Sequence, residues 1–172
     1  MGSYEIVVQG SRMIANLGKW MEMAAEHARE KGFEPDVLAH ARLAPDQYSL
    51  VGQVQAACDQ AKNTAAYLSG SKPPSHPDTE TTFAELQARI RTCLAYLEGF
   101  SAKDFGPAED VRVAPPWMGG KSVRGDAYLE RLAIPNLYFH VTTVYAILRH
   151  NGVDLGKGDY IGIKDFSELG AE

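Results

Sequence analysis

The sequence predicts an all-α fold, a single four-helix bundle formed by residues 1–172. Four segments repeat apolar residues at alternating steps of three and four, the spacing of one helix face. The length suits one domain, and 45% hydrophobic with 23% charged residues is typical of a globular protein. Because each helix carries one apolar stripe, the four stripes must be buried against one another.

The first two helices are marked by their stripes and by the residues near their ends. The first stripe comprises Ile6, Gly10, Met13, Leu17, Trp20 and Ala24. Gly32 follows, and glycine favours a helix C-terminus. The second helix is expected from about Pro45 to Leu68, with proline in its first turn and Gly70 at its end. Its stripe comprises Val51, Val54, Cys58, Ala61, Ala65 and Leu68.

The third and fourth helices have clear boundary signals. The third begins after Thr82, which has capping-box spacing with Glu85. Its stripe comprises Phe83, Leu86, Ile90, Cys93, Leu97 and Phe100. The fourth runs from near Asp126 to a C-cap at Asn151. Pro135 lies inside it, and we expect a kink there because proline removes a backbone hydrogen bond.

The connections between these helices differ in character. The proline-rich segment 69–81 is long enough to cross the end of the bundle instead of making a tight turn. Between the third and fourth helices, "VRV" and "KSVRG" flank a Pro-Pro-Trp-Met-Gly-Gly turn, which predicts a short β-hairpin or an ordered loop. We expect Trp117 in this turn to cap one end of the bundle, with a lid or a binding aromatic as the alternative. The glycine-rich tail after residue 152 is expected to pack irregularly.

Charge and composition exclude some classes of partner. The net charge of −5 argues against a nucleic-acid backbone as the partner, which normally needs a basic face. No stretch approaches the ~20 apolar residues of a membrane helix, and the N-terminus lacks the pattern of a signal peptide. Cys58 and Cys93 lie on apolar stripes and are too few for a disulfide framework, which indicates buried, reduced thiols in a cytoplasmic protein.

The stripe of the fourth helix contains polar residues where a core is expected. Asn136, His140 and Thr143 continue the stripe that begins at Leu129 and Leu132. A buried amide or imidazole costs up to a few kcal/mol unless it finds partners.

The second helix offers such partners in Gln55 and Asp59, which are one turn apart. We expect Asp59 to accept the Nδ1–H of His140 and to fix its tautomer.

Two interpretations of this polar set remain open. It is either a satisfied buried network that fixes helix register, or the floor of a ligand pocket between the second and fourth helices. As a metal site, His140 and Asp59 would supply a nitrogen and an oxygen, with a weak carbonyl oxygen from Asn136 or Gln55. A catalytic zinc needs three firm protein ligands, and only two are present. If the protein is an enzyme, His140 is the candidate general base.

Three stretches carry a resemblance to a known family: "LAPDQYSLVGQVQAACDQAK", "DTETTFAELQARI" and "IPNLYFHVTTVYAILRHNGVDLGKGDY". Together they resemble an uncharacterised branch of the DinB-like (YfiT-like) helical-bundle superfamily. The resemblance implies an up-down-down-up order of the four helices, a bacterial cytoplasmic origin and homodimers.

Typical members of that superfamily are metal-dependent enzymes with one His on the second helix and an H-x-x-x-H pair on the last. His140 matches the second His of the pair, whereas Asn136 and Gln55 fall at or near the other two positions. We therefore expect a small-ligand pocket of Gln55, Asp59, Asn136, His140 and Thr143, with a degenerate divalent-metal site as an open question. The alternative is a non-catalytic bundle that acts through dimerisation or partner binding.

Overall fold

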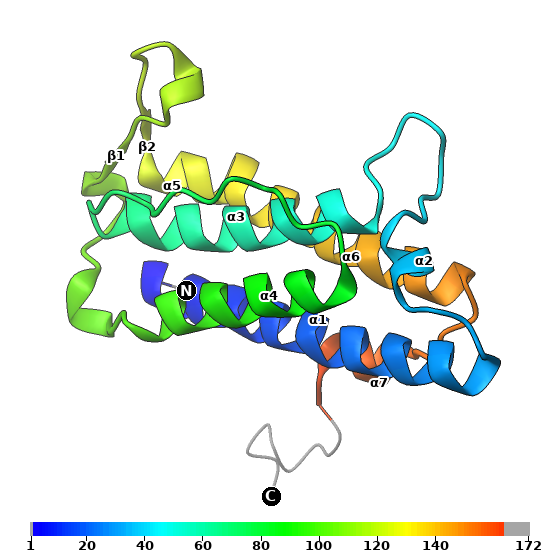
Figure 1. Cartoon of the computed structure of the whole chain (residues 1–172). Helices are drawn as coiled ribbons and strands as arrows, with labels where there is room; N and C mark the ends of the chain where they lie inside the picture. Colours follow the sequence, from blue (N-terminus) through cyan, green and yellow to red (C-terminus); the bar gives the residue numbers. More distant parts are fainter. Residues whose placement is uncertain (1, 164–172) are drawn as a thin grey trace, which may run out of the picture.

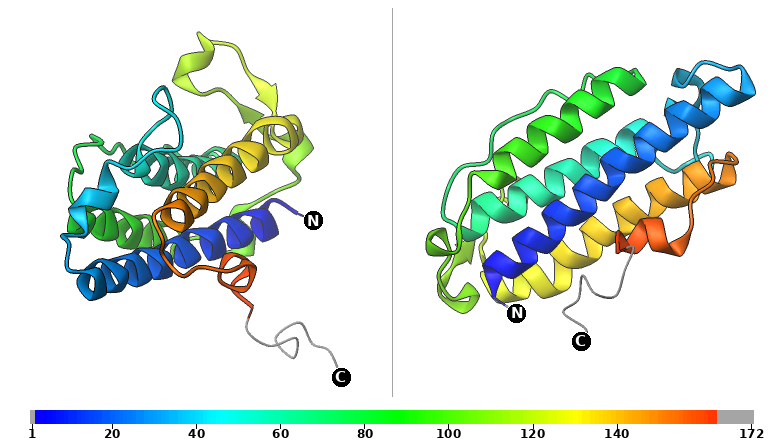
Figure 2. Two further views of the ribbon diagram at one scale, coloured as in Figure 1. Left: turned by 90° about the vertical axis from the view of Figure 1, so that its right-hand side faces the viewer. Right: turned by 90° about the horizontal axis from the view of Figure 1, so that it is seen from below.

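Four long helices form the body of the computed structural model, which describes residues 2–163 (Figure 1). They are α1 (Ser3–Lys31), α3 (Leu50–Leu68), α4 (Phe83–Glu98) and α6 (Ile134–His150). Each lies in a segment where apolar periodicity predicted a helix, so the prediction of a mainly helical fold is confirmed. The helices α1 and α3 pack together, with α4 and α6 on either side of that pair (Figure 2).

The apolar stripes of the four helices meet in one core. Trp20 of α1, Val54 of α3, Leu86 of α4 and Ile147 of α6 are all buried in it. The two free cysteines are buried as well. Within residues 2–163, no helix has both the length and the apolarity that a membrane crossing requires.

The ends of the helices follow the local sequence with one exception. The backbone of Gly32 is left-handed after α1, and Thr82 and Glu85 form the predicted capping box at the start of α4. Hydrogen bonds from the backbone N–H groups of Thr81 and Thr82 lower the pKa of Glu85 to about 2. The exception is α3, which begins at Leu50 after an extended Ser49, so the prediction that Pro45 lies in its first turn is wrong.

The segment before α6 is not a regular α-helix. A short helix α5 (Gly125–Tyr128) leads into a π-helical segment η4 (Leu129–Ala133), and Pro135 then lies in the first turn of α6. A π-turn contains an extra residue, which rotates the residues before it relative to those after it. Leu129 and Ala133 are consequently buried, whereas Leu132 is partly exposed. The expectation that Leu132 lies on the core stripe is therefore wrong.

The predicted hairpin is confirmed. Strand β1 (Arg112–Val113) pairs antiparallel with β2 (Val123–Arg124) around the 3₁₀ turn η3 (Pro116–Met118), and the hairpin projects from one end of the bundle (Figure 1). Trp117 lies in this projecting turn and is 68% exposed. The prediction that it caps the bundle is wrong, because the turn carries it away from the helices.

The remaining elements are short. They are α2 (Asp36–Ala39), the 3₁₀ turns η1 (Ala102–Asp104) and η2 (Ala108–Asp110), and α7 (Lys157–Ile161). The helix α7 lies in the tail that was expected to be irregular. It packs on α1, where Tyr160 stacks on Trp20 and the carbonyl of Asp159 accepts a hydrogen bond from the indole. These contacts explain why this part of the tail is ordered. The rest of the tail, from residue 164 onward, lies outside the described residues.

Candidate functional site

His140, the centre of the predicted site, is buried between α6 and α3. Its Nδ1 lies 2.7 Å from Oε1 of Gln53, and Nε2 of Gln53 donates to the backbone carbonyl of Tyr48. Because that second bond orients the amide, its oxygen faces the imidazole, and Nδ1 of His140 carries the proton. Burial lowers the pKa of His140 from its ordinary value of 6.5. The ring is therefore neutral at pH 7, with Nε2 unprotonated.

A second amide contact lies one turn earlier on α6. Nδ2 of Asn136 donates to Oε1 of Gln60 at 2.8 Å. Nε2 of Gln60 then lies 2.9 Å from Oγ1 of Thr64 and 3.1 Å from the hydroxyl of Tyr128. Gln53 and Gln60 are two helical turns apart, so both face α6. We call Gln53, Gln60, Asn136 and His140 the amide ladder.

Thr143 is buried beside this ladder but does not join it. Its Oγ1 donates to the backbone carbonyl of Phe139 on its own helix at 2.7 Å. The hydroxyl proton is thus already used, and the side chain acts as a small core residue.

The two residues predicted on the second helix face elsewhere. Nε2 of Gln55 donates to Glu80, and Oδ1 of Asp59 lies 2.6 Å from Nη2 of Arg89. The predicted hydrogen bond between Asp59 and His140 is therefore wrong. Its physical reason is angular: each residue advances about 100° around a helix, so Asp59 faces α4 while its neighbour Gln60 faces α6.

The side chains that the sequence analysis suggested as metal ligands do not converge on one point where they could bind an ion. His140 meets α3 at Gln53, whereas Asp59 faces α4, and the amide nitrogen of Asn136 is bonded to Gln60. Among residues 2–163, no three His, Cys, Asp or Glu side chains gather where they could hold an ion. No step of chemistry at His140 therefore follows from a bound metal.

A set of charged residues, which the sequence did not reveal, occupies the other side of α3. This charged cluster comprises Asp59, Lys62, Asp78, Glu80 and Arg89. The guanidinium of Arg89 contacts three carboxylates within 3.0 Å, and its side chain is 2% exposed. Burial alone would lower the pKa of Arg89, but Asp59 and Glu80 raise it above its ordinary value. The acidic residues near the end of the 69–82 connection, Asp78 and Glu80, were the sequence feature that could have predicted this cluster.

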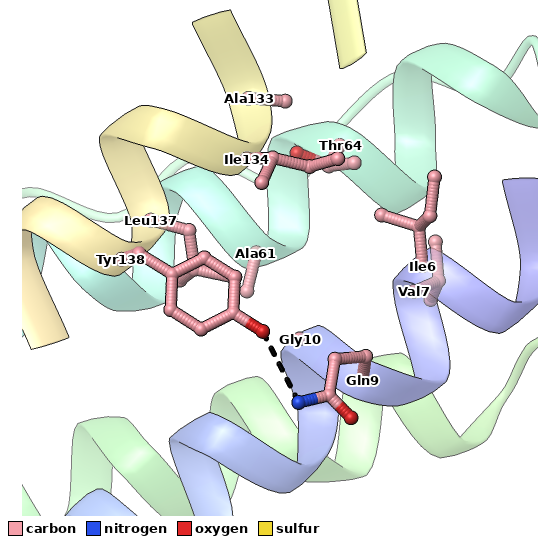
Figure 3. A pocket seen from close by; sticks show the side chains of 10 residues that line it. All are labelled: Ile6, Val7, Gln9, Gly10, Ala61, Thr64, Ala133, Ile134, Leu137 and Tyr138. Carbon is pink, nitrogen blue, oxygen red and sulfur yellow. Dashed lines mark hydrogen bonds between the residues drawn. The ribbon is translucent and has the colours of Figure 1, made fainter. Parts of the chain in front are cut away.

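A cavity of about 200 Å³ lies between α1, α3 and the start of α6 (Figure 3). Its lining is mostly apolar and comprises Ile6, Val7, Gln9, Gly10, Ala61, Thr64, Ala133, Ile134, Leu137 and Tyr138. At one edge, Nε2 of Gln9 donates to the hydroxyl of Tyr138 at 3.1 Å (Figure 3). A Cβ on Gly10 would lie 3.3 Å from Cδ2 of Leu137, so glycine allows the two helices to approach closely beside the cavity.

The cavity could not be predicted from the sequence, although its small lining residues were visible there. Small residues at positions 10, 61 and 133 were visible on three different segments, yet only the packing shows that they leave a space. His140 and Asn136 do not line this cavity.

These features define a helical-bundle protein with a neutral polar ladder, a charged cluster and an apolar cavity around one central helix. Residues 4–161 match a family model described as "Domain of unknown function (DUF1993)", so the chain belongs to this family. It is also similar to the crystal structure of a DinB family member protein from Shewanella denitrificans. The identity is 48%, the match covers 93% of this chain and 92% of that chain, and the TM-score is 0.88.

These matches confirm the resemblance to an uncharacterised branch of the DinB-like proteins. The chain has no match among curated proteins.

Proposed function

We propose that this protein binds a small, largely apolar molecule in the cavity between α1, α3 and α6. The single observation that carries the proposal is the cavity of about 200 Å³ with a mainly apolar lining. An apolar cavity of about 150 Å³ in another protein stays dry and accepts benzene. The cavity here has room for a molecule of roughly the size of a substituted benzene ring. This cavity differs from the pocket expected between the second and fourth helices, because its lining includes none of Gln55, Asp59, Asn136, His140 and Thr143.

The edge of the cavity indicates one polar group on the ligand. The hydroxyl of Tyr138 accepts from Gln9, so its own proton is free to be donated. Within residues 2–163, Oε1 of Gln9 has no hydrogen-bond partner. A hydroxyl group on the ligand would satisfy both, because it accepts from Tyr138 and donates to Gln9. A phenol is the simplest probe of this chemistry.

The amide ladder positions the walls of this cavity in the proposal. Thr64 lines the cavity and accepts a hydrogen bond from Gln60, which is also the partner of Asn136. A change in the ladder would therefore shift α3 relative to α6 and alter the shape of the cavity. His140, which does not line this cavity, is assigned this positioning role and not a catalytic one.

The test is calorimetric titration of the protein with p-cresol and, separately, with toluene. We expect saturable binding of both, with p-cresol tighter by about fivefold to tenfold, the worth of one net hydrogen bond. Ala61→Leu places a larger side chain in the cavity and is expected to abolish binding. Ala95→Leu, at an exposed position on α4, is the matched control and leaves binding unchanged. Equal binding by Ala61→Leu and wild type would overturn the proposal.

Tyr138→Phe separates the polar from the apolar part of the proposed ligand. It removes the hydroxyl at the edge of the cavity and keeps the ring. The advantage of p-cresol over toluene should then become smaller, because only the hydrogen bond to Oε1 of Gln9 is left, while toluene still binds.

We further propose that the four long helices run in the up-down-down-up order, in a cytoplasmic homodimer. The order is supported by the connection 69–82, which runs back along the bundle from the end of α3 to the start of α4 (Figure 1).

The dimer is supported by Phe139 and Leu132, which are 54% and 36% exposed near the start of α6. Light scattering of wild type and Phe139→Lys tests it, and a monomeric wild type would exclude it.

A further inference from the structure

A second cavity lies against α3, between the connection 69–82 and strand β1. Its volume is about 550 Å³, and it is separate from the apolar cavity. Its charged lining consists of three basic side chains, Lys62, Lys72 and Arg112, and one acidic side chain, Asp59. This excess of positive charge contrasts with the net charge of −5 of the whole chain. Such a concave surface concentrates anions.

Lys62 supplies a buried cation at this cavity. Its side chain is 4% exposed, and Nζ lies 2.8 Å from Oδ1 of Asp59 and 3.1 Å from Nδ1 of His76. An ammonium group has three N–H donors, so one remains after these two contacts. Asp59 also binds Arg89, so its negative charge is shared between two cations.

His76 presents a further donor because of its contact with Lys62. An ammonium can only donate, so Nδ1 of His76 accepts and Nε2 carries the proton. Burial, then the charges of Lys62 and Arg89, lower the pKa of His76 from its ordinary value of 6.5, so the ring is neutral at pH 7. Within the described chain, Nε2 has no hydrogen-bond partner.

Two more donors lie on the same face of α3. Asn63 and Tyr67 are one turn apart and both line the cavity. Neither side chain has a hydrogen-bond partner among residues 2–163. Burial and the charge of Asp59 raise the pKa of Tyr67, so its hydroxyl keeps its proton. The cavity therefore offers several unused donors in a concave space.

We propose that this cavity binds the anionic group, a phosphate or a carboxylate, of a small molecule. Lys62, His76 and Tyr67 form the inner donors, and Lys72 and Arg112 supply charge at the exposed rim. The site lies on a different side of α3 from the apolar cavity, and the ion binds here independently of any apolar ligand. Arg112 is available for this role because it has no ion pair in the described part of the chain.

The experiment is a titration of the full chain with inorganic phosphate and, separately, with acetate, at constant ionic strength. Binding is followed by amide chemical shifts in nuclear magnetic resonance spectra. We expect saturable shifts at residues 62–76 with at least one of the two anions. Arg112→Gln should weaken binding about fivefold, as for one partly screened charge. Lys62→Met should weaken it about tenfold or more, because it removes a buried charged donor.

Lys121→Gln is the matched control, since Lys121 is exposed on the same hairpin and does not line the cavity. If Lys62→Met fails to fold, Arg112→Gln and Lys72→Gln still decide the matter, because both side chains are exposed. Saturation by phosphate alone or by acetate alone supports the site and identifies the anion. No saturation by either, or equal binding by Arg112→Gln and Lys121→Gln, overturns the proposal.

Discussion

The two sides of α3 bury polar residues in different ways. Toward α6, Gln53 and Gln60 pair with neutral His140 and Asn136 in the amide ladder. Toward α4, the charged cluster surrounds Arg89 with three carboxylates. One helix of 19 residues thus carries a neutral interface on one side and an ionic one on the other.

The two sides of α3 should differ in how much stability is lost when one interaction partner is removed. A neutral hydrogen bond contributes a modest net free energy, and its loss strands a dipole. A buried ion pair recovers its desolvation cost only while every partner is present, and removal of one partner leaves an uncompensated charge. We therefore expect the charged cluster to be more sensitive to substitution than the amide ladder.

The largest effect is expected from Arg89→Met. This change removes the buried cation that Asp59, Asp78 and Glu80 share. Because these carboxylates are partly exposed, we expect a loss at the lower end for a broken buried pair, about 3 kcal/mol in the free energy of unfolding. Urea unfolding measures it. Arg91→Met, at an exposed position on the same helix, is the control and should change stability by less than about 0.5 kcal/mol. A similar small change in both variants would remove the contrast between the two sides.

Gln60→Ala should have the next largest effect. It removes the partner of Asn136 and of the buried hydroxyl of Tyr128, with an expected loss of about 1–3 kcal/mol by urea unfolding. A double-mutant cycle with Asn136→Ala should give a coupling free energy of about 0.5 kcal/mol or more. Additive effects would show that the two amides do not interact in solution.

A pH-dependent effect tests the burial of neutral His140 in the amide ladder. Because the folded-state pKa of His140 is lowered, the unfolded state binds a proton more readily, and stability is lost as the pH falls below about 6.5. His140→Gln removes this titration, and the decline of the unfolding free energy between about pH 7 and 5 should become shallower. It does not vanish, because the pKa of His76 is lowered too. His150→Gln, exposed at the end of α6, is the control, and equal slopes in both variants would contradict the assignment.

The smallest effect is expected from Trp117→Ala. The side chain is 68% exposed on the hairpin, so its removal should change the unfolding free energy by less than about 0.5 kcal/mol. Thermal unfolding of the two proteins measures this directly. A loss comparable to that of Gln60→Ala would mean that the indole packs against the bundle in solution.

The main helices were predictable because each buries one continuous apolar face. Periodicity located α1, α3, α4 and α6, and local chemistry located the capping box at Thr82. The polar partners on α3 were not predictable to the residue, because a shift of one position turns a side chain by about 100°. Asp59 was chosen for His140, although Gln53 and Gln60 are the residues that face α6.

The cavities were not predictable, since a void is a property of several segments packed together. Gly10 and Ala61 are small, but small residues also permit close packing, as Gly10 does against Leu137. The burial of Lys62 and Arg89 was also not predictable from the sequence. It depends on ion pairs that include acidic residues of the 69–82 connection, and an irregular connection has no periodic pattern from which its path could be predicted.

The π-helical segment η4 has a consequence for comparing this chain with its relatives. A single residue inserted into an α-helix can be accommodated by such a widened turn. An alignment with a protein whose last helix is regular would then need a one-residue gap at Leu129–Ala133. Without that gap, each position before the segment would be paired with a residue turned by about 100° around the helix, while Asn136 and His140 would still align correctly.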